Sequence, residues 1–258
     1  MTQALRYSVA FTKTGALEFL RRKDIYVVAI LMLLMVLGAA TFGFFGVKGL
    51  ATFIRDVTFS VVGLFTALLT VLISSRQISE EISRKTIYPI LARPITRWQF
   101  LLGKWFSAWL ISSVAFVALA LIGAGMLLIF SIPVGPIFFQ YVILKVVGTA
   151  WLAAVTIALT VCLTPAAATT ISLIIAFGSA AFGRTIVLMN ADSPMSSFAL
   201  NLLYSVLPHY DYFDLGAKVT YAWPPVPWWT IALMCAYSIT NGAVWLGAGW
   251  LKFRKQVV

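Results

Sequence analysis

The sequence carries little charge, and very little of that charge is negative. Of its 258 residues, 10% are Asp, Glu, Lys or Arg, and only eight are acidic. Hydrophobic residues make up 61% of the chain and the mean hydropathy is +0.96, well above the roughly 45–50% apolar content of soluble domains. This composition excludes a soluble globular domain and predicts an integral membrane protein. The length allows about six spans of roughly 20 residues with short loops, and no additional soluble catalytic domain.

Histidine and cysteine are also scarce. His209 is the single histidine, which excludes His-based metal clusters. Cys162 and Cys235 lie inside apolar runs, without the spacing of a metal site or a disulfide framework. His209 could hold a cation weakly together with Asp211 and Asp214, but a polar face of an outer helix explains these three residues more simply. We therefore expect no metal or cofactor in this chain.

Nucleotide and nucleic-acid binding are not indicated either. Gly103-Lys104 is followed by Trp105 and preceded by Trp98 where a Walker motif requires glycine, so this pair cannot cradle phosphates. The net charge of +11 comes from residues that flank the apolar runs, as in cytoplasmic loops of membrane proteins. We expect no nucleic-acid partner and no catalytic activity in the chain by itself.

No Asp or Glu lies in the middle of any predicted span. Carriers driven by protons or sodium usually place an ionisable group there, so the energy for any transport is expected to come from elsewhere. A secondary carrier is the weaker alternative. A membrane-embedded enzyme acting on lipids is weaker still, because only the group of His209, Asp211 and Asp214 could supply its site.

The apolar runs predict an all-α integral membrane protein, with a single domain over residues 1–258. We expect six transmembrane helices, at residues 25–46, 57–75, 100–130, 146–163, 166–183 and 228–250. Residues 1–24 suit an amphipathic helix in the plane of the interface, and 137–145 suit an interfacial approach to the fourth span. The apolar runs within 190–227 are too short to span. They predict short re-entrant or interfacial outer helices, which must pack on protein.

The basic residues predict the orientation. Most of the 19 Lys and Arg residues lie near the termini and in the segment 76–97, which places both termini and this segment in the cytoplasm. Lys145 is assigned to the opposite side. Lys104 lies among several tryptophans near the start of the third span, and we expect it to anchor that helix at the interface. Ala39/Gly43 and Ala243/Gly247 are pairs of small residues that could form packing seams.

The segment 76–97 is the densest run of charge in the chain. Glu80 and Glu81 precede Arg84 and Lys85, which is the favourable order for a helix dipole, and Leu91 belongs to an apolar face that could seat on a soluble partner. The alternative is a solvated loop whose charge only sets the topology.

This part of the sequence resembles the ABC type-2 exporter permease family. The resemblance rests on Glu80-Glu81, Thr86, Ile90-Leu91, Arg93-Pro94, Thr96-Arg97 and Gly103-Lys104. The sequence departs from the family at Lys85, where many members have glycine, and at Pro89. Residues 203–215 are similar to a segment of the branch that contains permeases of copper-enzyme maturation loci, through Pro208, Phe213 and Asp214, with His209 where asparagine is usual.

The resemblance implies a half-transporter in a bacterial inner membrane. Two permeases, identical or homologous, would pair, and each would bind a separate cytoplasmic ATPase that holds the ATP and magnesium. The coupling helix within 76–97 would use Glu80, Glu81, Arg84, Lys85, Thr86, Leu91, Arg93, Pro94 and Arg97. The alternative is an ATPase-driven complex that acts on an extracytoplasmic partner without export. The scarcity of charge favours a lipid-like, amphiphilic or sulfur-containing substrate.

Overall fold

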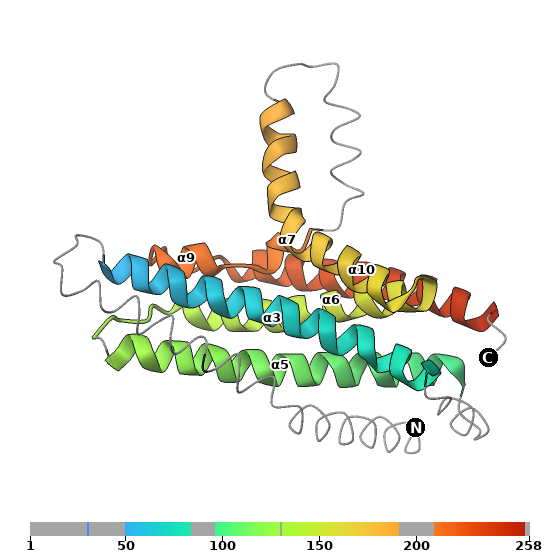
Figure 1. Cartoon of the computed structure of the whole chain (residues 1–258). Coiled ribbons are helices and arrows are strands. Elements are labelled where there is room, and N and C mark those ends of the chain that lie inside the picture. Colours follow the sequence, from blue (N-terminus) through green and yellow to red (C-terminus); the bar gives the residue numbers. More distant parts are fainter. Residues whose placement is uncertain (1–29, 31–49, 84–95, 130, 191–208, 256–258) are drawn as a thin grey trace.

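The computed structural model describes residues 30, 50–83, 96–129, 131–190 and 209–255, and these residues form helices and short connections (Figure 1). The elements are α3 (Leu50–Ser83), α5 (Arg97–Ile129), α6 (Ile137–Cys162), α7 (Pro165–Asn190), the 3-10 turn η2 (Asp211–Phe213), α9 (Gly216–Thr220) and α10 (Trp228–Lys255). No strand occurs in the described part of the chain. The all-α prediction is therefore confirmed at this level.

Four of these helices are long and apolar enough to cross a membrane. They cover Ala51–Ser79, Arg97–Ile129, Ile137–Cys162 and Trp228–Arg254, and Pro165–Ser179 in α7 is a shorter apolar helix. The chain is thus a multi-pass membrane protein. The count of six spans stays a prediction, because the span 25–46 and the interfacial helix 1–24 lie outside the described residues apart from Ile30.

Helices α3 and α6 begin well before the predicted spans 57–75 and 146–163. Helix α3 includes Arg55 and Asp56, which precede the predicted span 57–75, since no proline interrupts residues 50–83. The guanidinium of Arg55 donates to the carbonyl of Pro133 at 2.9 Å. This contact gives the charged side chain a polar partner near the start of the helix. Helix α6 begins at Ile137, directly after Pro136. The expected interfacial approach at 137–145 is therefore part of one continuous helix.

The long helices lie side by side in a bundle (Figure 1). The indole N–H of Trp151 donates to Asn241 at 2.9 Å, and the hydroxyl of Ser238 donates to the carbonyl of Val147 at 3.2 Å, so α6 and α10 run in the same direction. Trp105 and Trp109 of α5 donate to the carbonyls of Ala150 and Val146, in reversed order along α6. Helix α5 is therefore antiparallel to α6.

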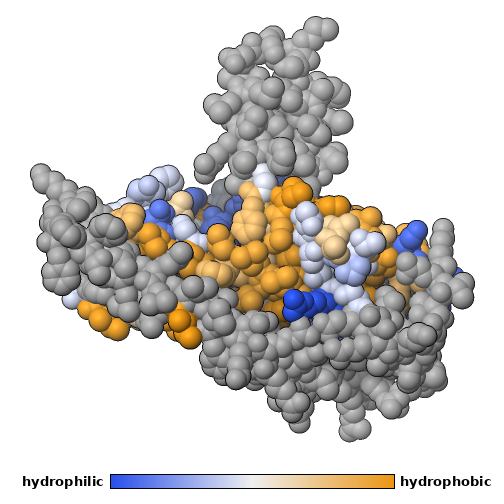
Figure 2. Space-filling view, viewed as in Figure 1, coloured by the Kyte–Doolittle hydropathy of each residue, from blue (hydrophilic) through white to orange (hydrophobic). Residues whose placement is uncertain are grey.

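Helix α7 has two parts in Figure 1: the first lies along the bundle and the C-terminal part projects from it. It packs against α3 and α6. The middle of the bundle presents a hydrophobic surface (Figure 2), as a lipid-facing protein requires.

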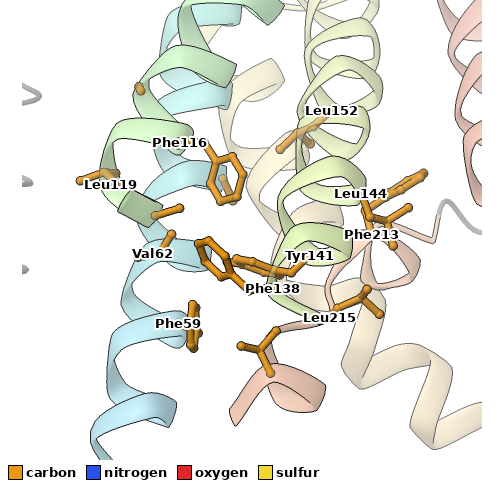
Figure 3. Close-up of a cluster of buried hydrophobic side chains, with 14 of the residues drawn as sticks. Phe59, Val62, Phe116, Leu119, Phe138, Tyr141, Leu144, Leu152, Phe213 and Leu215 are labelled. Atoms are coloured by element: carbon orange, nitrogen blue, oxygen red, sulfur yellow. The ribbon is translucent and has the colours of Figure 1, made fainter. Parts of the chain in front are cut away.

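The buried side chains form two clusters. The larger one joins α3, α5 and α6 to the segment that carries η2 and α9, with Phe59, Tyr141 and Phe213 among its members (Figure 3). The smaller one lies near the other end of the bundle and contains Ile78, Phe100 and Phe253 from α3, α5 and α10. The larger cluster contains residues of the segment 209–227. The smaller cluster contains residues of the helix ends on either side of the connection between α3 and α5.

Candidate functional site

The start of α5 is built from a reciprocal capping interaction. The backbone N–H of Gln99 donates to the hydroxyl oxygen of Thr96 at 3.3 Å, and the backbone N–H of Thr96 donates to the side-chain oxygen of Gln99 at 3.1 Å. This Thr-x-x-Gln capping box satisfies two amides that a helix start leaves open. Helix α5 therefore begins at a defined point, immediately after the segment that was predicted to couple to an ATPase.

Arg97 connects this helix start to the end of α10. Its Nη1 atom donates to the carbonyls of Phe253 and Arg254, at 2.9 and 3.2 Å, and its guanidinium lies 5.8 Å from the centre of the Phe253 ring. The last carbonyls of a helix have no partner within the helix and attract cations. Arg97, predicted as a coupling residue, thus ties the first turn of α5 to the last turn of α10.

The other predicted coupling residues are described less completely. Glu80 and Glu81 belong to the last turn of α3. Arg84, Lys85, Thr86, Leu91, Arg93 and Pro94 lie outside the described residues. Ile78, Phe100 and Phe253 share one buried cluster, so the end of α3, the start of α5 and the end of α10 meet at one end of the bundle.

Lys104 is buried within the protein, with only 7% of its surface exposed. Its ammonium lies 5.9 Å from the centre of the Phe100 ring, a favourable distance for a cation–π interaction. The sequence predicted an anchor at the lipid interface, and this stays a prediction. In the structure, Lys104 lies against the cluster that joins α5 to α10.

The outer segment, residues 209–227, enters the bundle deeply. Phe213 is buried, and a Cβ atom built on Gly148 would lie 2.6 Å from the Cβ atom of Phe213. Gly148 is the twelfth residue of α6, about 16 Å along the helix from Ile137 at 1.5 Å per residue. Figure 3 shows Phe213 beside Leu144 of α6. The segment is therefore packed on protein, and we call it the re-entrant segment because it returns into the bundle. Whether it also re-enters the membrane stays a prediction.

Both ends of this segment are held by specific contacts. The backbone N–H of His209 donates to the hydroxyl oxygen of Tyr237 at 3.3 Å, and the His209 ring stacks on Tyr212 with 4.8 Å between centres. At the other end, Gln140 of α6 donates to the carbonyl of Val226 and accepts from its N–H, both at 2.8 Å. The segment is therefore fixed to both α6 and α10.

An ion pair joins the re-entrant segment to α6. The ammonium of Lys145 donates to Oδ2 of Asp214 at 2.7 Å, and the backbone N–H of Gly216 donates to Oδ1 of Asp214 at 2.8 Å. Lys145 is 1% exposed, whereas the Asp214 side chain is 42% exposed. Burial raises the pKa of the Asp214 carboxyl, but Lys145 and the Gly216 N–H outweigh it, so this pKa lies below its usual range.

Tyr210 and Gly63 both lie next to this ion pair. The Lys145 ammonium lies 5.2 Å from the centre of the Tyr210 ring. Gly63 of α3 lies behind the pair: a Cβ atom there would be 3.5 Å from Asp214 Oδ2 and 3.6 Å from Lys145 Nζ. Among the described residues, the buried hydroxyl of Tyr141 has no hydrogen-bond partner.

The sequence analysis treated Lys145 as a flanking charge before the predicted span 146–163. In the structure, Lys145 lies inside α6, about 12 Å from its first residue. A signal was available: an apolar run drawn from Ile137 places this lysine within a span, where an ionisable residue usually has a function. Its partner could not have been found in the same way, because Asp214 is 69 residues away in sequence.

The remaining residues predicted for the outer segment are Pro208, which lies outside the described residues, and Asp211, which is half-buried. Within the described ranges, no three His, Cys, Asp or Glu side chains lie together as a metal ion would need. Asp214 is instead paired with Lys145.

The comparison with known families agrees with the motifs. The family described as ABC-2 family transporter protein matches residues 17–183, more than half of the chain, including α3, α5 and α6. No curated protein matches the chain. Members of this family form the membrane part of ABC transporters, which implies an ABC ATPase as partner, and the assignment to the copper-enzyme branch stays a prediction. The chain belongs to the ABC-2 family of transporter proteins.

Proposed function

We propose that this chain is the permease subunit of an ABC exporter, that it dimerises, and that a separate cytoplasmic ATPase drives it through the connection between α3 and α5. The Arg97 contact carries this proposal. A force applied to the residues between Ser83 and Arg97 would reach α5 through its capped first turn, and α10 through the carbonyls that Arg97 binds. Two long helices would then move together as a rigid body.

The charges of the described residues support the orientation. Arg97, Lys104, Lys252 and Arg254 lie at the end of the bundle where α5 starts and α10 ends. Positive-inside asymmetry supports a cytoplasmic position for this end, and the bacterial inner membrane is the proposed location. The re-entrant segment enters from the outer side.

The exposed face of α10 supports dimerisation. Ala243 is exposed, and a Cβ atom added to Gly247 would meet no other heavy atom within 4 Å, as far as the described chain extends. By contrast, a Cβ atom on Gly249 would lie 3.1 Å from the backbone of Ala158. Small residues on a free helix face allow the backbones of two membrane helices to approach closely.

The test is co-purification with the ATPase encoded beside this gene, after gentle detergent extraction. We expect wild type to co-elute with the ATPase and to stimulate ATP hydrolysis. Reversing both acidic charges (Glu80→Lys with Glu81→Lys) should abolish both effects. Asp56→Lys is the matched control, because Asp56 is an exposed acid at the other end of α3. The proposal fails if wild type shows no association, or if the control loses it to the same extent.

A further inference from the structure

We propose that Lys145 is the binding point for the oxyanion head group, a carboxylate or phosphate, of an amphiphilic substrate, and that Asp214 occupies this position when the substrate is absent. The inference rests on the proposed export function, since it names the class of molecule exported.

The first observation is the place of the lysine. Lys145 lies about 12 Å along a membrane-spanning helix and is buried. Placing a charge at such a depth is unfavourable, and in membrane proteins the residues that carry one commonly line a substrate path. Lys145 is thus the kind of residue that a transport site would use.

The second observation is the accessibility of its partner. The Asp214 side chain is 42% exposed, although it is bonded to a residue at this depth. A carboxylate facing lipid there would be strongly disfavoured, so the exposed side of Asp214 faces water. Figure 2 shows hydrophilic residues beside the hydrophobic middle of the bundle. The pair is thus open to water on the Asp214 side.

The third observation is the form of the space that the carboxylate fills. One oxygen accepts from the Lys145 ammonium and the other from the Gly216 N–H. Gly63 and Gly216 place no side chain against it, and a Cβ atom on Gly216 would come within 2.9 Å of Oδ1. An ammonium and a backbone N–H on separate oxygens would bind any small oxyanion in the same way.

The fourth observation is a pair of buried tyrosines beside the ion pair. Tyr141 is fully buried and Tyr210 is 4% exposed. Within the described part of the chain, the Tyr141 hydroxyl has no hydrogen-bond partner, although unpaired buried polar groups are rare. The centre of the Tyr210 ring lies 5.2 Å from the Lys145 ammonium. The ion pair is therefore bordered by a donor that no described group uses.

The test removes the Asp214 carboxylate and then offers a small anion that can bind Lys145 in its place. The full-length permease is purified alone in detergent, as wild type, as Asp214→Ala, and as Asp214→Ala with Lys145→Met. Thermal unfolding is followed while sodium formate, or inorganic phosphate, replaces chloride at constant ionic strength. We expect formate to raise the midpoint of Asp214→Ala saturably, by about 2–4 °C. Wild type should need at least about tenfold more formate for the same rise in midpoint, because the Asp214 carboxylate competes with formate for Lys145. The double variant should show no rise.

Two outcomes would overturn the proposal. If Asp214→Ala and the double variant respond equally, the anion does not bind at Lys145. If Asp214→Ala does not respond to any anion, the pair has only a structural role. Should Asp214→Ala fail to fold, Asp214→Ser takes its place, since serine is also too short to fill the carboxylate position.

A second arm identifies the source of the head group. The same variants are placed in nanodiscs of phosphatidylcholine with or without about one-tenth phosphatidic acid. A Lys145-dependent stabilisation by phosphatidic acid assigns the site to lipid head groups, and a response to formate or phosphate alone assigns it to soluble anions. Neither arm uses ATP or the ATPase, so a negative result leaves the proposed coupling intact. Conversely, if the permease does not co-purify with the ATPase, anion binding at Lys145 can still be observed.

Discussion

Lys145 of α6 and Asp214 of the re-entrant segment form an ion pair of 2.7 Å inside the bundle, although 69 residues separate them in sequence. The pair neutralises a lysine that would otherwise be buried alone in a spanning helix. It also fixes the depth of the outer segment, because Gly216 and Phe213 flank Asp214 and pack against neighbouring helices.

Removing one partner should destabilise the fold more than removing both. Lys145→Met and Asp214→Leu each leave one buried charge or polar group without its partner, and we expect a loss of about 3 kcal/mol or somewhat less, because solvent screens the exposed side of Asp214. The double variant should recover much of this loss. Chemical unfolding in mixed micelles measures the difference, with the exposed Lys252→Met as control. Strictly additive losses would contradict the pairing.

Acidification should weaken the same contact. The pKa of Asp214 is lowered in the folded protein, so its stabilising contribution is complete above the ordinary Asp pKa of about 3.9 and is lost as the pH falls through the lowered folded pKa. We expect the unfolding midpoint of wild type to fall more than that of Asp214→Asn below about pH 4. If the unfolding midpoints of the two proteins fall equally below about pH 4, other carboxylates are responsible for the acid destabilisation.

The contact between Gly148 and Phe213 should tolerate no methyl group. Gly148→Ala would place a Cβ atom 2.6 Å from Phe213, so the re-entrant segment must shift, at a cost of about 1–3 kcal/mol. Gly125→Ala is the matched control in α5, because its Cβ atom would meet nothing within 4 Å in the described structure. That change should be neutral or slightly stabilising, since alanine favours a helix over glycine. Equal effects of the two changes, measured by thermal unfolding, would argue against the deep placement of Phe213.

Arg97→Ala should loosen the end of α10. Without the guanidinium, the carbonyls of Phe253 and Arg254 lose their donor, and we expect a local loss of about 1–2 kcal/mol. Hydrogen exchange should then become faster in the last turn of α10. Arg76→Ala, an exposed change on α3, should leave this exchange unchanged. Unaltered protection in Arg97→Ala would show that hydrophobic packing alone holds α10.

Substitutions at Gly247 and Gly249 of α10 should separate dimerisation from folding. Gly247→Leu projects from a face that no other described residue covers, and we expect it to shift the native mass in detergent from dimer to monomer with little change in unfolding temperature. Gly249→Leu collides with the backbone of Ala158, so it should lower the unfolding temperature by several degrees, roughly in line with overpacking of 1–3 kcal/mol. A dimer that survives Gly247→Leu would place the interface elsewhere.

Much of the architecture was predictable from local sequence. The apolar runs that predicted spans 3 and 6 correspond to α5 and α10, because a helix must stay apolar for about 20 residues to cross lipid. Thr96 and Gln99 have the spacing of a capping box, which ties the start of α5 to that position. The motifs at 80–104 indicated the family, and the match over residues 17–183 confirms it.

The sequence was less informative at helix ends and for contacts between distant segments. Arg55 and Lys145 suggested loops or interfaces because hydropathy treats every charge as a boundary. In the structure, each charge is compensated by a group that lies far away in the chain, the Pro133 carbonyl and the Asp214 carboxylate.

The sequence by itself determined that this protein is helical, crosses a membrane and belongs to a transporter family, since these properties depend on composition, periodicity and a local motif. Only the tertiary structure decided that Asp214 reaches Lys145, that Phe213 lies against Gly148, and that Arg97 binds the end of α10. The physical reason is that a buried charge or a helix-end carbonyl requires a partner of complementary charge, but the sequence does not specify which one. That choice is made when the helices pack.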